Sequence, residues 1–261
     1  MKFFDCFMYY DEDLILDVRL NTLNDYIDKF VIVEANVDHQ GNKKKLNFNI
    51  DNYKKFKEKI IYKVIEFFPE NFNDWERENF QRNFITNGLN SAKEDDYIII
   101  SDIDEIPNLS KLSNIKKYKF TVFEQKMFYY KINLLNKTVP IWTGSKMCQK
   151  KHLKSPQWLR SQKVKKYPFW KFYKIKWNLI KNGGWHFSFL MTPEKVQKKI
   201  KSFAHSEFNT NKFTNLNKIS TSINQGLDIF DRDMVYQKID FDNSFPNYIL
   251  NNREKFKDWI L

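Results

Sequence analysis

Short apolar runs alternate with amphipathic segments over the first hundred residues of this chain. The runs predict buried strands at residues 2–10, 30–34, 60–67 and 97–100. Two segments predict helices, at residues 11–24 and 74–92, and Asp74 is a suitable N-cap for the second. The order strand, helix, strand, strand, helix, strand predicts an α/β sheet with helices on its faces.

The rest of the chain is less regular. Residues 120–133 alternate in character and predict strands, whereas residues 142–173 are basic, aromatic and poor in periodicity, which favours an irregular region facing the acceptor. A glycine pair precedes a strand-like run at residues 182–189. Residues 192–208 predict a helix with Thr192 as N-cap and proline at its first position, and the remainder predicts loops with a docking C-terminal segment.

Composition and cysteine content set the protein class. A chain of 261 residues that is 42% hydrophobic can form one domain, with or without an appendage. No apolar run approaches the roughly 20 residues that span a bilayer, and acids interrupt the N-terminus where a signal peptide needs an apolar core. Two cysteines, Cys6 and Cys148, do not form a disulfide framework. We therefore expect a cytoplasmic protein in a reduced compartment.

Charge is distributed unevenly along the chain. Residues 1–124 carry 18 Lys and Arg against 23 Asp and Glu, residues 125–193 carry 15 against none, and residues 194–261 carry 11 against 9. The acid-free segment could bind nucleic acid, an anionic membrane surface or a sugar diphosphate, or form a solvated lysine-rich surface. No recognisable nucleic-acid-binding motif accompanies it, so we expect no nucleic acid, whereas a peripheral membrane contact stays open.

The strongest chemical signal follows the fourth predicted strand. Asp102, Asp104 and Glu105 come directly after residues 97–100, and Pro107 is expected to end that strand. In an extended chain the side chains of Asp102 and Asp104 point the same way and can share one ligand. Such a pair suits Mg²⁺ or Mn²⁺ bound together with substrate phosphates, and an acidic turn without a metal is the alternative.

Two further groups of residues are candidates for the same site. Arg77 and Arg82 diverge by about 140° around their predicted helix, so we expect one to face the site and the other to form an ion pair. His186 follows the glycine pair and could supply an imidazole to the metal, or be an ordinary satisfied polar residue. Few carboxylates are available as a general base, and we rank Glu207 first, Glu105 second and Glu194 third.

Several motifs in the order FDCFMYYDEDLILDVRLNTL, FVIVEANVDHQG, WERENFQRNFITNGL, YIIISDIDEIP, NGGWHFSF and KIKSFAHSEF resemble glycosyltransferase family 17 over about residues 1–232. The resemblance implies a GT-A-like, Rossmann-type sandwich with a central mostly parallel sheet. It implies a catalytic domain at residues 1–232, with a nucleotide-sugar half (1–124) and an acceptor-facing half (125–232), and a docking segment at 233–261. Unlike the family's Golgi members, the sequence shows no membrane anchor or stem.

The resemblance also implies site residues and ligands. Asp102 and Asp104 match the family's D-x-D motif, residues 183–186 its GGWH and His205 with Glu207 its H-x-E, which adds His205 to the expected metal ligands. UDP-GlcNAc is the implied donor and Mn²⁺ or Mg²⁺ the implied ion, with a glycan or glycoprotein as acceptor. We expect the donor to be contacted by residues at the strand ends, on the second helix and in the glycine pair: Glu34, His39, Arg77, Arg82, Asn83, Asp102 and Gly184.

The sequence thus predicts a metal-dependent, inverting glycosyltransferase. A basic nucleic-acid-binding protein remains an alternative because of the charge distribution. A metal-dependent phosphoesterase is the other, since it could use Asp102, Asp104, His186 and His205.

Overall fold

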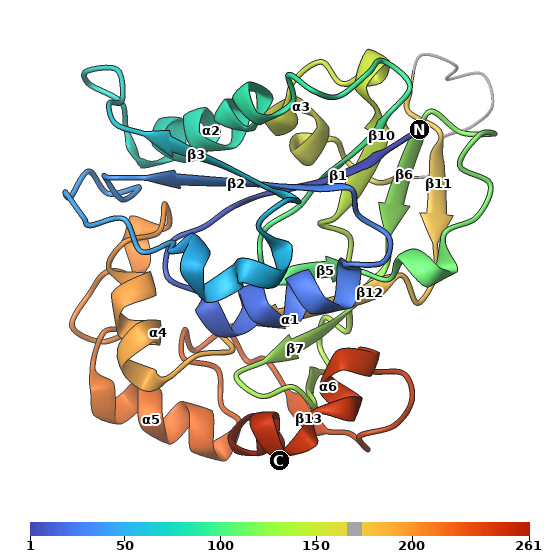
Figure 1. Ribbon diagram of the computed structural model, residues 1–261. Helices are drawn as coiled ribbons and strands as arrows, with labels where there is room; N and C mark the ends of the chain where they lie inside the picture. Colours follow the sequence, from blue (N-terminus) through green and yellow to red (C-terminus); the bar gives the residue numbers. More distant parts are fainter. Residues whose placement is uncertain (166–173) are drawn as a thin grey trace.

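Two β-sheets with helices packed on their faces make up the protein, as shown by a computed structural model that describes residues 1–165 and 174–261 (Figure 1). The larger sheet has seven strands in the order β11-β6-β10-β4-β1-β2-β3. These are β1 (Phe3–Met8), β2 (Lys29–Ala35), β3 (Ile60–Ile65), β4 (Tyr97–Ile100), β6 (Phe120–Phe123), β10 (Lys146–Gln149) and β11 (Trp177–Ile180). Neighbouring strands are parallel except at β10, which runs antiparallel to both β4 and β6. A mostly parallel central sheet is therefore confirmed.

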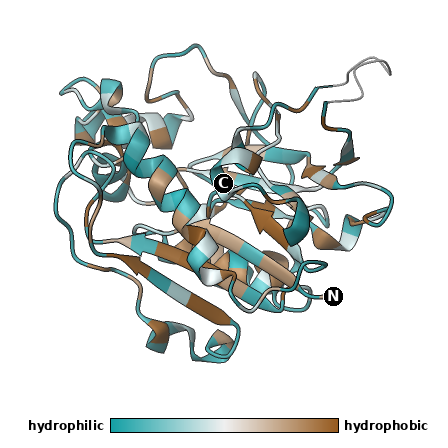
Figure 2. Ribbon diagram, turned by 90° about the horizontal axis from the view of Figure 1, so that it is seen from above, coloured by the Kyte–Doolittle hydropathy of each residue, from teal (hydrophilic) through white to brown (hydrophobic). Residues whose placement is uncertain are grey.

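Alternation of side chains along the strands creates a core on each face of this sheet. Phe7, Ile32 and Ile99 point to one face and pack with helix α1 (Asp13–Leu23). Their neighbours Cys6, Val31 and Ile98 point to the other face. There they pack with the residues that follow α2 (Asp74–Phe84) and with α3 (Pro156–Ser161). Figure 1 shows α1 on one side of the sheet and α2 and α3 on the other, and Figure 2 shows the hydrophobic character of the strands between them.

The second sheet lies beside the first and takes its strands from residues 105–238. Its strand order is β13-β8-β7-β12-β5, with β9 paired to β7. The strands are β5 (Glu105–Pro107), β7 (Gln125–Tyr129), β8 (Leu134–Asn136), β9 (Ile141–Trp142), β12 (Gly184–Ser188) and β13 (Tyr236–Lys238). Helices α4 (Pro193–Ile200) and α5 (Leu216–Gln225) bury Val196, Ile200 and Ile219 in a third cluster against it. Gly184, at φ +140°, lets β12 approach β5 where a Cβ would meet the carbonyl oxygen of Ile106.

The C-terminal segment packs against the first helix of the chain. Helix α6 (Asn247–Asn251) lies against α1, and the hydroxyl of Tyr248 donates to Asp17. The two cysteines are buried and free, in agreement with the sequence. None of the helices in the described ranges is long and apolar enough to cross a bilayer.

Several element boundaries differ from the sequence prediction. Helix α2 ends at Phe84 and continues as a 3-10 turn, and its N-cap is Asn73 rather than Asp74, because Asn73 and Glu76 form a reciprocal capping box. Pro107 does not end β4, since it belongs to the separate strand β5. Helix α4 ends at Ile200 rather than near residue 208, and a separate short 3-10 turn follows at Ser206–Phe208. The sequence does not predict helix α5.

The segment 142–173 is not irregular throughout. It contains β10, which lies buried between β4 and β6, so the central sheet takes strands from both sides of residue 124. The functional division of residues 1–232 into two halves stays a prediction. Residues 166–173 of that segment lie outside the described residues.

Candidate active site

A cavity of about 350 Å³ opens at the carboxyl ends of three parallel strands. Residues that follow these strands line it: Tyr9, Tyr10 and Glu12 after β1, Val37, Asp38 and His39 after β2, and Asp102, Ile103 and Asp104 after β4. The chain runs from β1 outward to β2 and β3 and then returns to place β4 on the other side of β1. In open α/β sheets, ligands bind outside the strand ends at this reversal of strand order. The volume is also within the range of small-molecule sites.

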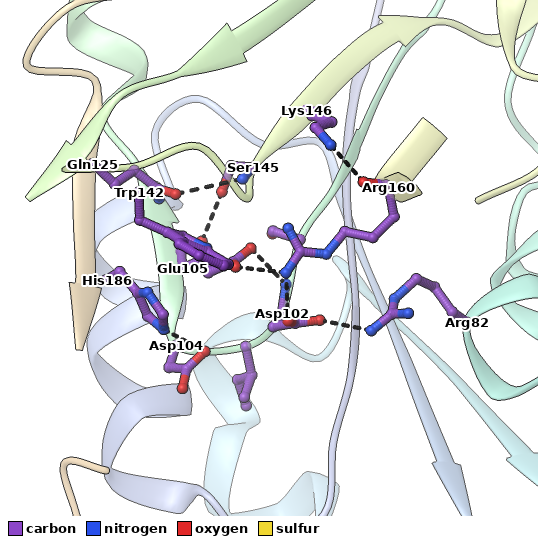
Figure 3. Close-up of polar contacts among 12 residues, drawn as sticks. Arg82, Asp102, Asp104, Glu105, Gln125, Trp142, Ser145, Lys146, Arg160 and His186 are labelled. Carbon is purple, nitrogen blue, oxygen red and sulfur yellow. Dashed lines mark hydrogen bonds and ion pairs between the residues drawn. The ribbon is translucent and has the colours of Figure 1, made fainter. Parts of the chain in front are cut away.

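Asp102 lies in a turn and is held by two arginines. The backbone N–H of Glu105 donates to the carbonyl of Asp102, so this segment is not extended as predicted. Arg82 donates to one carboxylate oxygen of Asp102 at 3.0 Å and Arg160 to the other at 2.7 Å (Figure 3). Burial alone would raise the pKa of Asp102, but the two guanidinium groups outweigh it and hold the pKa well below its usual range. Asp102 is therefore ionised and already paired.

Glu105 is buried beneath this pair. Its carboxylate accepts hydrogen bonds from Arg160 at 2.7 Å, from the indole of Trp142 at 2.5 Å and from the backbone N–H of Asp102 at 3.0 Å. Gly144 packs so closely on it that a Cβ there would lie 2.0 Å from Oε1. Three acceptor positions are thus used, which leaves one on Oε2. Glu105 lines the cavity, as expected for a candidate base.

Asp104 makes longer polar contacts than Asp102, the other aspartate of the motif. His186 Nε2 and Lys199 Nζ each lie 3.6 Å from it. Burial opposes ionisation, but the charge of Lys199 and the contact with His186 lower the pKa of Asp104 to about 2. Burial likewise favours neutral His186, yet Asp104 and the other acids outweigh it and raise the pKa of the imidazole. Nδ1 of His186 is buried without a hydrogen-bond partner among the described residues.

Arg19 fixes the turn that carries these acids, and sequence reasoning missed it. Its buried guanidinium binds both carboxylate oxygens of Asp5 on β1, at 2.6 and 2.7 Å. It also donates to the backbone carbonyls of Asp102, Ile103 and Glu105 at 2.8–3.0 Å. The available signal was an arginine between Val18 and Leu20 on an otherwise apolar stretch of helix α1.

The predicted metal ligands do not gather into one cluster. Across residues 1–165 and 174–261, no group of three or more His, Cys, Asp and Glu side chains is arranged to hold a metal ion. Asp102 is occupied by arginines, and His205 lies beyond α4, where its Nδ1 is 2.7 Å from Glu207. The chain offers Asp104 instead, with His186 beside it. This donor set fits an ion whose coordination is completed by substrate phosphates and water, as Mg²⁺ sites often are, but not a cage made by the protein alone.

The two arginines of α2 diverge, as predicted. Arg82 lines the cavity and also pairs with Glu78 at 2.8 Å, whereas Arg77 donates to the carbonyl of His39 and pairs with Asp74 at 3.3 Å. Nε of Arg82 is buried and has no partner within the described part of the chain. Only Arg82 is thus placed to contact a ligand in the cavity.

His39 is another predicted donor contact that lines the cavity. Its Nε2 is 2.9 Å from Oε1 of Gln81, and burial lowers the pKa of the imidazole. The ring is therefore neutral at ordinary pH.

Three other predicted contacts serve the fold. Glu34 is buried and accepts hydrogen bonds from Lys44, from Tyr62 and from the backbone of residues 47 and 48, so it fixes the loop after β2. Asn83 is exposed and accepts from the backbone N–H of Gln157 in α3. Gly184 allows the contact between β12 and β5 described above. None of these three belongs to the cavity wall, and their contact with the donor stays a prediction.

Of the proposed bases, Glu207 and Glu194 lie outside the cavity wall. The side chain of Glu207 is 58% exposed, and its hydrogen bond to His205 lowers its pKa. Glu194 is exposed at the start of α4. Glu207 lies outside the cavity wall because α4 ends earlier than predicted. His205 then reaches the cavity rim, whereas the side chain of Glu207 points to solvent.

Comparison with known proteins identifies relatives of the chain and its family. The chain is 25% identical to the mouse protein named beta-1,4-mannosyl-glycoprotein 4-beta-N-acetylglucosaminyltransferase, over 93% of this chain and 51% of the mouse protein. The rat protein of that name is equally similar, and the human one is 25% identical over 74% of this chain and 42% of its own length. The chain thus spans about half the length of the curated relatives it matches. Residues 1–140, which include α1, α2 and the D-x-D turn, match the model of glycosyltransferase family 17, and the chain belongs to that family.

Proposed function

We propose that this protein transfers a sugar, GlcNAc from UDP-GlcNAc, to a hydroxyl group of a glycan. The observation that carries the proposal is a cavity at the reversal point of the sheet, lined by Arg82 beside Asp102 and by Lys199 beside Asp104. Family membership and the names of the mammalian relatives support the same reaction. The strand order β3-β2-β1-β4 supports a GT-A-like fold.

The donor diphosphate would lie beside the cations of the cavity. Arg82, whose terminal nitrogens bind Asp102, Glu78 and Gln157, adds positive charge to the cavity wall. Lys199 offers a point charge whose pKa the acids around it raise although burial opposes this. Asp104 would hold Mn²⁺ or Mg²⁺ together with the diphosphate oxygens. Such an ion, when bound, offsets the negative charge that develops on the leaving nucleotide.

Glu105 is the base in this proposal. Its carboxylate is fixed by Arg160, Trp142 and the backbone of Asp102, and the free acceptor position on Oε2 can take the proton of an acceptor hydroxyl. Attack of that hydroxyl on the anomeric carbon from the face opposite the leaving nucleotide inverts the configuration. Arg160 then acts as a positioning residue, because it holds Asp102 and Glu105 together without lining the cavity.

The test measures donor binding and transfer separately. A thermal-shift panel of nucleotide sugars, with and without Mn²⁺, should give a metal-dependent shift that is largest for UDP-GlcNAc. Asp104→Asn should abolish the Mn²⁺-dependent part of that shift and the transfer, while Asp95→Asn, at an exposed carboxylate 73% accessible, serves as the matched control. Unchanged Mn²⁺ dependence in Asp104→Asn would refute the metal assignment. No shift with any nucleotide sugar would refute the donor.

The remaining expectations form part of the same proposal. The acceptor is a glycan or glycoprotein, and the basic segment 125–193 contacts a membrane surface peripherally in a cytoplasmic enzyme. No observation on the described residues favours either alternative function. A phosphoesterase site built from Asp102, Asp104, His186 and His205 would require a cluster that these side chains do not form across the described ranges.

A further inference from the structure

Trp142 is a fixed aromatic side chain at the rim of the cavity. It lies on β9, opposite Gln125 of β7, and 36% of the residue is exposed. Its indole N–H donates to Glu105 at 2.5 Å, and its ring centroid lies 5.6 Å from that of His186 at an interplanar angle of 40°. The polar group of the indole is thus satisfied inside the protein, so only the apolar face of the ring is available to a ligand.

The position of Trp142 separates it from the donor side of the cavity. Figure 3 shows Trp142 and His186 on one side of the D-x-D turn and Arg82 on the other. In the proposed function the nucleotide occupies the side of β1, β2 and Arg82, where the sheet reverses its strand order, and its diphosphate extends to Asp104 in the D-x-D turn. The side of Trp142, built from β9 and β12 of the second sheet, is left for the other substrate.

The chemistry of the ring and its surroundings selects the kind of ligand. A pyranose has an apolar face of C–H groups and a rim of hydroxyls, so it can stack on an aromatic ring while its hydroxyls reach polar neighbours. Ser188, His186 and Glu105 supply such neighbours on the same wall. A ring that is held in place by a hydrogen bond loses little conformational entropy when a ligand stacks on it.

We propose that Trp142 is the stacking platform for a pyranose ring of the acceptor, next to Glu105. The proposal rests on the proposed function, since it assigns the acceptor side of the same cavity. The neighbouring residue Ile141 is 42% exposed but does not belong to the cavity wall, because successive residues of a strand point to opposite faces. It provides a control of similar exposure on the same strand.

Saturation-transfer difference NMR with four methyl pyranosides (β-mannoside, β-glucoside, β-galactoside and β-N-acetylglucosaminide) in the presence of UDP tests the platform. The wild type should saturate the ring protons of at least one of them. Trp142→Ala should reduce that saturation at least fivefold, whereas Ile141→Ala should retain it within twofold. Trp142→Phe keeps an aromatic face but loses the bond to Glu105, and it should retain most of the signal.

Each outcome of these measurements supports or overturns the stacking role of Trp142. No pyranoside saturated by the wild type, or equal saturation in wild type and Trp142→Ala, would overturn the platform. Loss in Trp142→Phe as complete as in Trp142→Ala would overturn stacking in favour of a role through Glu105. The thermal shift with UDP-GlcNAc is recorded on every variant. Absence of that shift in the wild type would refute the proposed donor, whereas an intact shift with no pyranoside signal would refute only the platform.

Discussion

Replacement of Arg19 by lysine tests whether one buried side chain holds the D-x-D turn in place. The guanidinium makes six hydrogen bonds: two to Asp5, three to the backbone carbonyls of residues 102, 103 and 105, and one to the hydroxyl of Ser101. A lysine ammonium has three donors on one atom, so at least half of these bonds must be lost. The positive charge opposite Asp5 is retained, which limits the change to geometry.

The expected loss of stability follows from burial. Each lost hydrogen bond leaves a buried acceptor without a partner at a cost of about 1–3 kcal/mol, so the loss of three costs at least ~3 kcal/mol, a large part of the ~5–15 kcal/mol that stabilises a typical domain. With a urea dependence of about 3 kcal/mol per M for a chain of this size, the unfolding midpoint of Arg19→Lys should fall by roughly 1 M or more. The measurement is urea unfolding followed by tryptophan fluorescence.

A second variant shows whether replacement of an exposed arginine by lysine lowers the unfolding midpoint in the same way. Arg253 is exposed and lies over the ring of Phe241, and Arg253→Lys should leave the midpoint almost unchanged. The donor-induced thermal shift should also decrease in Arg19→Lys, because the turn that carries Asp102 and Asp104 loses its backbone contacts. If the midpoint of Arg19→Lys stays within ~0.3 M of the wild type, about 1 kcal/mol at that slope, the turn does not depend on this residue.

Three further outcomes can be checked. Arg82→Lys should raise the KM for UDP-GlcNAc about tenfold with kcat little changed, because lysine lacks the guanidinium fork, and an unchanged KM would remove Arg82 from the donor site. Burial lowers the pKa of Lys146 to about 8, so between about pH 8 and 10.5 the unfolded chain binds a proton that the folded chain does not. The free energy of unfolding should therefore rise with pH in that window relative to Lys146→Gln, and parallel pH profiles would contradict this. Glu207→Gln should keep kcat within about twofold, because the side chain of Glu207 points to solvent. A catalytic base contributes ~10²–10⁴-fold to kcat, so a decrease of kcat by that factor would identify Glu207 as the base.

The central sheet could be predicted because its signals are local. The apolar runs of β1, β2 and β4 are buried on both faces, and such strands need no distant partner to be identified. Element ends were less predictable where two neighbouring residues compete. Asn73 and Asp74 both suit an N-cap. Asn73 occupies that position because Glu76, three residues later, completes the capping box.

The contacts of the site were less predictable than its location. The D-x-D turn was placed correctly at a strand end, but its partners come from distant parts of the chain: Arg160 is 58 residues from Asp102, and Arg19 is 83 residues away. The periodicity of a strand or helix contains no information about such pairs. An extended D-x-D segment was predicted wrongly for the same reason, since Arg19 draws three carbonyls of that segment towards one guanidinium and stabilises a turn.

The uneven charge of the sequence has a structural cause at this site. Asp102 and Glu105 come from the part of the chain with excess acid. Glu105 is buried and the side chain of Asp102 is 35% exposed, so both carboxylates require a cationic partner. Arg160 supplies that charge from the acid-free segment 125–193. Lys146, on the buried strand β10, in turn donates to the carbonyls of Arg160 and Gln162 and so holds the end of α3 in place. Part of the basic segment is therefore an internal counter-charge for the D-x-D turn, and separation of the chain near residue 124 would leave these acids without Arg160.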